Sequence, residues 1–413
     1  MFTEKVLVTY KILVRLAVFN FYENLMKFSL VCFVLIILPN VLAAQTLKVA
    51  TFNASMEANN YASLGMQPSI EVLPKVLSTG DNPQVKNIAE IIQRVNPDII
   101  LLNEFDYVED KSKGVNAFVK NYLQVSQSGQ APVDYPYTFI APVNTGFATP
   151  FDLDNNGKFE QYGSDAMGFG FYYGQYAMVL LSKYPIDTEN VRTFQHFKWR
   201  DMPSHLKTSY PDGRPWYDED EWNALRLSSK SHWDVPIEVN GHTVHILAMH
   251  PTPPSFDGEE DRNGKKNADE IRFMADYLTP EKGAYIYDDN EELASLEPQT
   301  RFVLVGDFNA ADIGDKYREG VIEQLTESPL VNNSVIPMSK GGAEAFEEVY
   351  SDRYTAYWGA RADYVLPSTY GFEVKASGVF WPHKDSDLYR LVEDRNASSD
   401  HRLVWVSLML ADN

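Results

Sequence analysis

Cysteine and basic residues are both scarce in this sequence. Cys32 is the only cysteine among 413 residues, so the chain cannot close a disulfide on itself. Lys and Arg number 36 against 57 Asp and Glu, which gives a formal net charge of −21. A protein that holds long nucleic acids by neutralising their phosphates needs the opposite balance. The charge argues against a tight binder of long nucleic acids, although it does not exclude a nuclease that works through bound cations.

The first 44 residues have the layout of an export signal. Met26-Lys27 precedes an apolar run over 28–38, and small residues follow at 41–44. A positive start, a short apolar run and a small-residue end are the order of a secretory signal peptide. We predict a signal peptide over 1–44, with a start at Met26 and a secreted or periplasmic product that has no stable membrane anchor.

Cleavage after Ala43 or Ala44 would change the mature chain in two ways. It would remove Cys32, and it would move the net charge from −21 to −23, because residues 1–43 carry four basic and two acidic side chains. The alternative is a true N-terminal anchor that reaches back to Val6.

No linker-like stretch and no internal repeat is visible after residue 45. We therefore predict one domain over 45–413. Apolar residues at helical spacing predict helices over 85–95 and 268–278. Strand-like runs lie between them, at 47–52, 98–102, 177–182, 235–239, 243–248, 302–305, 364–366 and 403–408.

The connections between these elements define the fold class. The run 98–102 is apolar throughout, which is typical of a strand buried on both faces, and a helix separates it from the strand at 47–52. Asn240-Gly241 predicts a two-residue hairpin turn. Because parallel-type and hairpin connections both occur, we predict an α/β or α+β class with mixed sheets.

Polar residues that can bind a cation lie at the ends of several predicted strands. They are Asn103-Glu104, Asp307 with Asn309, Asp363, and Asp400-His401 before the last strand. Ligands gather where parallel strands end, so these side chains can converge on one site. Carboxylate and amide oxygens suit Mg²⁺, Mn²⁺ or Ca²⁺ better than zinc. A single strand-end Asp is more often a turn former or helix cap, but the recurrence of such segments favours a metal site.

These segments, in their order along the chain, resemble the endonuclease/exonuclease/phosphatase superfamily. The matching segments are Thr51-Phe52-Asn53, Asn103-Glu104, Gly306-Asp307-Phe308-Asn309, Asp363-Tyr364 and Ser399-Asp400-His401. The superfamily includes secreted DNases, abasic-site endonucleases, sphingomyelinases and inositol-polyphosphate phosphatases. The resemblance runs from Leu47 to about Leu410. It implies a four-layered α/β/β/α sandwich, in which two mixed β-sheets are flanked by helices.

The resemblance also implies roles for individual residues. Glu104 is expected to be the principal metal ligand, with Asn53 close by and Asp400 completing the metal site. Asp307 would orient or deprotonate the attacking water, and Asn309 would hold a phosphoryl oxygen. Such a division of labour suits phosphoryl transfer, which needs an activated water, positive charge on the phosphoryl oxygens and help for the leaving group.

Two histidines complete the implied site. His401, paired with Asp363, would act as a base or as a phosphate-binding cation, and His250 would assist departure of the leaving oxygen. Relatives often carry Gln where this chain has Asn103. His250 is followed by Pro251 and by no nearby carboxylate, so the alternative is a structural histidine at a strand end.

Tyr176 and Arg226 are further expected substrate-binding residues. Tyr176 begins a strand that resembles the family strand carrying a tyrosine near the scissile phosphate, and Arg226 lies where some relatives place a phosphate-contacting arginine. The alternatives are a packed strand tyrosine and an arginine in a surface ion pair.

A separate segment has the spacing of a calcium loop. Asp152, Asp154 and Asn156 alternate and are followed by glycine at the sixth position, as at the start of an EF-hand-type loop. Its twelfth position is Gly163, so Glu160 or Asp165 would have to supply the last ligand. We predict a structural Ca²⁺ site here, and the alternative is a surface turn.

Specificity is expected from two long loops. One is the segment 199–222, which is rich in Trp and Tyr, and the other is the segment 255–266. Aromatic rings can stack on bases, sit against a lipid or sugar, or pack the loop to the body of the protein.

The function expected from these features is an exported, Mg²⁺- or Mn²⁺-dependent phosphodiesterase, an extracellular nuclease that uses activated water and works as a monomer. A phosphatase or phospholipase-C-like enzyme for a smaller phosphoester is the alternative, and a non-catalytic binding protein on the same fold is a remote one. The complete set of implied catalytic residues argues against the last.

Overall fold

The computed structural model describes residues 46–65, 67–293 and 295–411. The predicted signal peptide therefore lies outside the described residues. Six strands form the first sheet in the order β10-β11-β1-β2-β4-β3. They are β1 (Thr46–Met56), β2 (Ile99–Phe105), β3 (Tyr137–Phe139), β4 (Met178–Ser182), β10 (Phe372–Val379) and β11 (Val404–Leu410). Only β1 and β2 run parallel, so the sheet is mixed.

Five strands form the second sheet in the order β5-β6-β7-β8-β9. They are β5 (Arg192–Thr193), β6 (His232–Val239), β7 (His242–Met249), β8 (Phe302–Asp307) and β9 (Asp363–Pro367). β7 and β8 run parallel and the other pairs run antiparallel. The predicted hairpin joins β6 to β7, where Asn240 and Gly241 both have positive φ, of 52° and 85°, as a type I′ turn requires.

Helices connect the strands of each parallel pair. α2 (Val72–Thr79) and α3 (Pro83–Val95) join β1 to β2, and α6 (Arg262–Tyr277) and α7 (Pro280–Gly283) join β7 to β8. The remaining helical segments are η1 (Ala58–Leu64), α4 (Val115–Phe118), η2 (Val119–Leu123), η3 (Trp199–Asp201), α5 (Glu219–Ala224), α8 (Glu323–Thr326), α9 (Lys340–Ala345), η4 (Ser351–Arg353) and η5 (Tyr389–Leu391). In the part of the chain that the structure describes, no helix has the length and apolarity needed to cross a bilayer.

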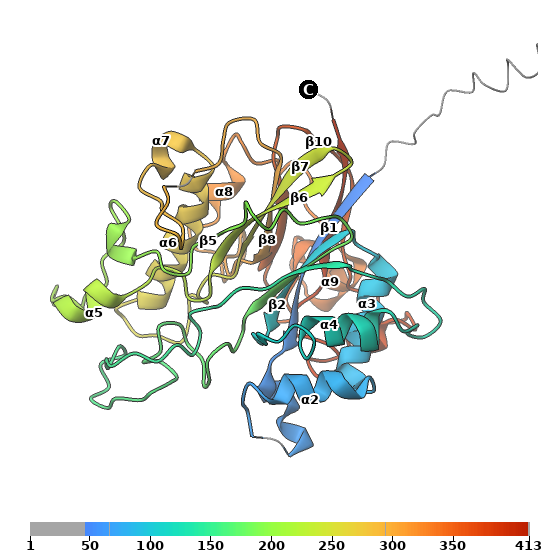
Figure 1. Ribbon diagram of the computed structural model, residues 1–413, viewed down its shortest axis with the longest axis horizontal. Helices are drawn as coiled ribbons and strands as arrows, with labels where there is room; N and C mark the ends of the chain where they lie inside the picture. The colour runs from blue at the N-terminus through green and yellow to red at the C-terminus, as the bar shows by residue number, and fades with distance from the viewer. Residues whose placement is uncertain (1–45, 66, 294, 412–413) are drawn as a thin grey trace, which may run out of the picture. The chain divides into compact units, whose positions relative to one another are not determined.

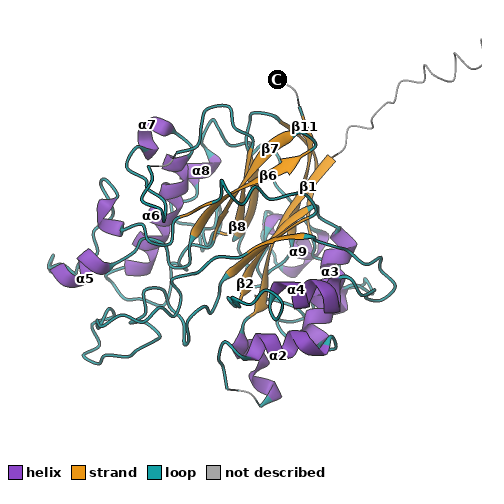
Figure 2. Cartoon of the chain, in the orientation of Figure 1, coloured by secondary structure: helices purple, strands orange, loops and turns teal. Residues whose placement is uncertain are grey.

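The two sheets pack face to face, with helices on the outer side of each (Figures 1 and 2). Alternation along β7 builds these layers: Ile246 belongs to the buried cluster shared with β1 and β2, whereas Leu247 joins the cluster under α6. Ile271 and Met274 of α6 fill that second cluster. Burying each such side chain contributes roughly 1.5–3 kcal/mol, so both faces of the central strands stabilise the fold. The predicted four-layered sandwich with mixed sheets is confirmed.

One local prediction was wrong. Asp363 was expected where an apolar strand ends, but it begins β9. β9 runs antiparallel to β8, and Asp363 is the register partner of Asp307 at the end of β8. The start of one strand therefore lies beside the end of the other, which brings Asp363 to the same edge of the sheet by a different route.

Candidate active site

Side chains from both sheets meet where these strand ends approach each other. Asn53 of β1 donates a hydrogen bond from its Nδ2 to Oδ2 of Asp307, at 3.1 Å, and so joins the first sheet to the second. Behind this contact, the backbone N–H of Asp307 donates to Oδ1 of Asn103 on β2, at 3.2 Å. The predicted cluster at the strand ends is therefore assembled across the interface between the sheets.

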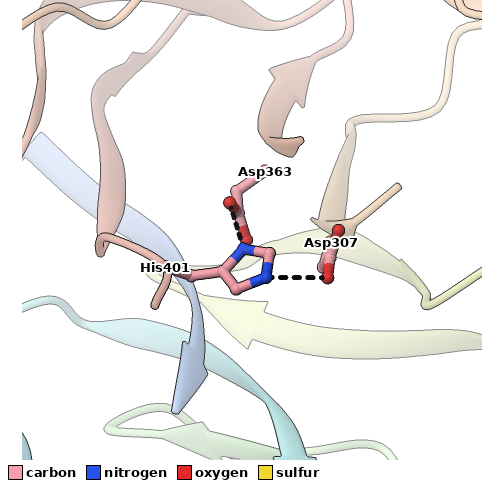
Figure 3. Close-up of side chains that lie close together, drawn as sticks. All are labelled: Asp307, Asp363 and His401. Carbon is pink, nitrogen blue, oxygen red and sulfur yellow. Dashed lines mark hydrogen bonds and ion pairs between the residues drawn. The ribbon is translucent and has the colours of Figure 1, made fainter. Parts of the chain in front are cut away.

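Asp307, His401 and Asp363 form a continuous buried row (Figure 3). Nδ1 of His401 lies 2.8 Å from Oδ2 of Asp363, and its Nε2 lies 3.5 Å from Oδ2 of Asp307. The hydroxyl of Thr355 donates to the same Asp363 oxygen, at 2.7 Å. Burial by itself lowers the pKa of His401, but the two carboxylates outweigh it and raise that pKa to about 10. His401 is therefore a cation at neutral pH.

The Asp307 carboxylate is held from several sides. The backbone N–H of Asn309 donates to its Oδ1 at 3.0 Å, and Nε2 of His250 lies 3.5 Å from its Oδ2. Burial raises the pKa of Asp307 to about 6, although the neighbouring His401 cation opposes the shift.

Gly306 has φ of 151°, and a Cβ there would lie 1.9 Å from the Met249 carbonyl oxygen. Only glycine fits the close approach of β8 to β7 before Asp307.

Several residues around the site have left-handed backbone conformations. Glu104, Asn309 and Tyr176 have φ of 56°, 51° and 58°. Non-glycine residues adopt this region at an energetic cost that folds tend to retain at functional sites. The side-chain Nδ2 of Asn309 donates to the Pro251 carbonyl at 3.2 Å, which links the segment after β8 to the segment after β7.

Glu104 and Asp400 are the carboxylates best suited to a metal. Burial, followed by the nearby Asp400 carboxylate, raises the pKa of Glu104 to about 7, and the Asn53 amide lies beside it. Asp400 accepts a hydrogen bond from Ser55 at 3.1 Å, and Arg395 lies 3.6 Å from it. Two carboxylates close to each other are the kind of oxygen donors that a hard cation stabilises.

The row of Asp307, His401 and Asp363 is also close enough to share an ion, since ligand atoms of all three lie within 4.8 Å of one another. A protonated imidazole, however, has no lone pair to offer a metal. The high pKa of His401 therefore favours charged hydrogen bonds along this row.

His250 is buried beside Asp307 and stays neutral. Burial lowers the pKa of His250 well below its usual value, and the Lys230 and His401 cations lower it further. Its Nδ1 has no hydrogen-bond partner among the described residues. His250 thus directs Nε2 of a neutral imidazole toward Asp307, while its buried Nδ1 has no partner among the described residues.

Tyr176 and Arg226 lie in different surroundings. The hydroxyl of Tyr176 lies 3.4 Å from Nδ2 of Asn59, and burial together with the Glu57 and Glu104 carboxylates raises its pKa. Arg226 donates to Oδ1 of Asn144 at 2.7 Å and stacks over Phe147. No described hydrogen bond or ion pair joins Arg226 to the cluster around Asp307.

Lys230 was not among the predicted site residues. It is a cationic residue that could take the role expected of Arg226. It is only 5% exposed, and its ammonium group makes no hydrogen bond or ion pair within the described residues. Burial lowers the pKa of Lys230, while the carboxylates of Glu270, Asp307 and Glu104 oppose that shift. Lys230 lies two residues before β6 and four residues after Arg226, which was the residue expected to contact the phosphate.

In the predicted calcium loop, the third side chain that lies beside Asp152 and Asp154 is Asp165 and not Asn156. Carboxylate oxygens of Asp152, Asp154 and Asp165 lie within 4.8 Å of one another. Asn156 turns its Oδ1 to the backbone N–H of Lys158, at 2.8 Å. Asp165 already accepts the backbone N–H of Leu153 at 2.8 Å. Asp165 is thus the substitute closest to Asp152 and Asp154, and a Ca²⁺ ion here stays a prediction.

The aromatic segment 199–222 contributes mainly to packing. Trp199 is buried, and its Nε1 donates to Asp269 of α6 at 2.8 Å. The Trp222 ring packs on Trp199 with 5.3 Å between centroids. Nε1 of Trp216 donates to the Leu153 carbonyl at 3.0 Å, which ties this segment to the acidic loop.

A sandwich of two mixed sheets with polar residues gathered at the strand ends is the architecture of one class of phosphoester hydrolases. The chain belongs to the endonuclease/exonuclease/phosphatase family, whose members hydrolyse phosphoesters: residues 50–401 match this family. No curated protein matches the sequence at a significant level.

Solved structures with a similar chain path come from several bacteria. An endonuclease/exonuclease/phosphatase from Beutenbergia cavernae is 17% identical, with a TM-score of 0.48, over 89% of this chain and 72% of that one. A double mutant of Staphylococcus aureus beta toxin with bound magnesium ions is 13% identical, at 0.44, over 88% and 99%. Sphingomyelinase C from Streptomyces griseocarneus is 13% identical, at 0.43, over 88% and 99%. Identities this low do not indicate a shared substrate.

Proposed function

We propose that this protein is an exported, monomeric, Mg²⁺- or Mn²⁺-dependent phosphodiesterase, a nuclease that uses water as its nucleophile. The observation that carries the proposal is the buried Asp307 carboxylate, which lies between His401 and His250 and accepts a hydrogen bond from Asn53. Phosphoryl transfer needs an activated water, positive charge on the phosphoryl oxygens and help for the leaving group. The residues around Asp307 can supply all three.

The metal would be held by Glu104 and Asp400, with the Asn53 amide beside them. When bound, a hard cation supplies positive charge to the phosphoryl oxygens. It would also relieve the repulsion between the two carboxylates. The same chemistry makes Mg²⁺ or Mn²⁺ more suitable than zinc, because the described residues include no cysteine and the pKa of His401 is raised to about 10.

Asp307 would hold the attacking water and take up its proton. Its pKa of about 6 leaves it ionised at neutral pH, and close enough to neutrality to accept a proton as the nucleophile forms. Asn309 lies two residues further on, where its backbone already contacts Asp307. Its side-chain amide would donate to a phosphoryl oxygen as charge develops.

Three groups would stabilise the phosphate and the leaving oxygen. His401 is a fixed cation because Asp363 orients and charges it. Lys230 brings a second positive charge that makes no ion pair within the described residues, and we assign to it the phosphate contact expected of Arg226. Neutral His250 can donate a hydrogen bond to the departing oxygen. Tyr176, whose pKa is raised by the Glu104 carboxylate among others, would contact the substrate near that residue.

The proposal is tested with the purified protein and a panel of substrates. Plasmid DNA, RNA, a chromogenic phosphodiester, a phosphomonoester and a phospholipid are each incubated with Mg²⁺ and with chelator. We expect cleavage of the nucleic acids and the diester only with the metal. We expect Asp307→Ala to lower kcat by about 10³-fold or more, because the water then loses its base.

Asp212→Ala is the matched control, since Asp212 lies on the surface in an ion pair with Arg214. It should leave the rate unchanged. Turnover that survives chelation, or that Asp307→Ala leaves intact, would contradict the mechanism. Cleavage of the phosphomonoester or phospholipid alone would favour the phosphatase or phospholipase-C-like alternative, which the net charge of −21 also supports.

A further inference from the structure

A short loop beside the site presents two exposed aromatic rings. The loop over 356–360 closes on itself, with the backbone N–H of Ala356 donating to the Ala360 carbonyl at 3.1 Å. Gly359 makes the turn with φ of 81°. The backbone N–H of Tyr357 donates to the Asp400 carbonyl at 2.9 Å. The loop is therefore fastened to the segment that carries Asp400 and His401.

The rings of this loop point outward instead of filling the core. Trp358 is 39% exposed and Tyr357 is 51% exposed, whereas Trp199 and Trp233 are fully buried. The Trp358 ring meets the His401 imidazole edge to face, with 4.6 Å between centroids and 82° between planes. The Tyr357 ring stands at 81° to Trp358. The two nearly perpendicular rings form an exposed aromatic corner, in which the Trp358 ring lies directly beside His401.

We propose that Trp358, with Tyr357 at its side, stacks the nucleobase of the nucleotide whose phosphate is cleaved. This inference rests on the proposed nuclease function and deepens it. An exposed indole held on a hydrogen-bonded loop can receive a planar ring without losing much conformational freedom. Base–aromatic stacking is a general way to bind single-stranded nucleic acid without reading its sequence.

Charge selects among the possible occupants of this corner. With a net charge of −21, the protein repels long polyanions and anionic membrane surfaces. A single unpaired nucleotide carries little charge and brings a flat apolar face. Contact between Trp358 and His401 places the ring within one nucleotide of a phosphate bound at His401. The corner therefore fits a short or single-stranded substrate with its base next to the cleaved bond.

The test uses three substrates that differ by one base. They are the dinucleotide thymidylyl-thymidine and its two analogues in which either sugar carries no base. Hydrolysis is followed with Mg²⁺ for the wild type, Trp358→Leu and Trp358→Phe. We expect the wild type to favour the intact dinucleotide over one abasic analogue by about tenfold, mainly through KM. Trp358→Leu should lose that preference, and Trp358→Phe should keep most of it.

Tyr137→Leu is the matched control, because Tyr137 is an aromatic residue with a similar exposed fraction, 38%, on the edge strand β3, and is placed in no part of the site. It should behave as the wild type. Equal rates on all three substrates, or an equal loss by Trp358→Leu on each of them, would overturn the stacking proposal and leave the nuclease function standing. A wild type that hydrolyses none of the three, yet cleaves other phosphoesters, would overturn both.

Discussion

Lys230 is a charged side chain held in the interior without a hydrogen bond among the described residues. Lys230 loses most of its hydration on folding, and the carboxylates that oppose this cost make no ion pair with it. The carboxylates of Glu270, Asp307 and Glu104 face it but form no ion pair with it. Such a residue is best explained by a negative group that arrives with the substrate.

Replacing Lys230 with methionine should therefore separate activity from stability. We expect Lys230→Met to lower kcat/KM by about 10²-fold or more, since one charged contact to the phosphoryl group is lost. The melting temperature should stay the same or rise. Lys266→Met is the control: Lys266 is also buried, but it donates to the Met167 carbonyl. A Lys230→Met enzyme within threefold of the wild-type rate would remove Lys230 from the site.

Asp307, Asp363 and His401 could be predicted from the sequence because each lies in a short motif that resembles a motif of the family. Lys230 could not be found this way. The role proposed for Lys230 rests on its burial and on the nearby charges of Glu270 and Asp307, which come together only in the folded chain. Judged by residue type alone, Arg226 is the better candidate for a phosphate contact. In the folded chain, however, its side chain donates a hydrogen bond to Asn144.

Helix α6 fastens the segments that carry the site. Its Glu270 is fully buried and accepts the backbone N–H of Ser229 at 2.7 Å and that of Thr252 at 2.6 Å. One carboxylate thus holds the residue before Lys230 and the segment after His250. From the same helix, Nδ2 of Asn267 donates to the carbonyl of Phe308 at 3.0 Å. α6 therefore acts as a positioning element for three site segments.

Glu270→Gln should test this positioning. Glutamine keeps one acceptor oxygen, but its NH2 group would face the other backbone N–H. One of the two hydrogen bonds that Glu270 accepts is therefore lost. We expect kcat to fall about tenfold or more and the free energy of unfolding to fall by about 1–3 kcal/mol. Glu281→Gln, on the exposed surface of α7, is the control and should leave kcat unchanged. Unchanged kcat of Glu270→Gln with the expected loss of stability would show that the Glu270 hydrogen bonds are structural only.

At the scale of the whole molecule, apolar patterns predicted the central strands, two helices and the mixed-sheet class, whereas the four layers were implied by the family resemblance. The central strands are long apolar runs, and α3 and the second half of α6 carry clear stripes. The short strands β3 and β5 and the edge strand β10 were missed. β10 buries only its ends and exposes Glu373 and Lys375, so its pairing with β11 decides its conformation more than its own sequence does.

Burial between the second sheet and α6 also makes the fold sensitive to acid. His232 is buried at the start of β6, and its Nε2 lies 3.1 Å from the Glu270 carbonyl oxygen. Burial lowers the pKa of His232 to about 3. The folded protein therefore keeps this imidazole neutral at pH values where the unfolded chain, with an ordinary histidine pKa of about 6.5, takes up a proton.

The unfolded state binds more protons than the folded state between these two pKa values, so stability falls as the pH drops. The contribution of His232 is fully present above pH ~6.5 and decreases by up to about 1.4 kcal/mol per pH unit on the way to pH ~3. Urea unfolding of the wild type and His232→Gln from pH 7 to pH 4 measures this. The variant should be less stable at pH 7, and the difference should shrink or reverse toward pH 4. Parallel stability curves would show that His232 titrates equally in both states.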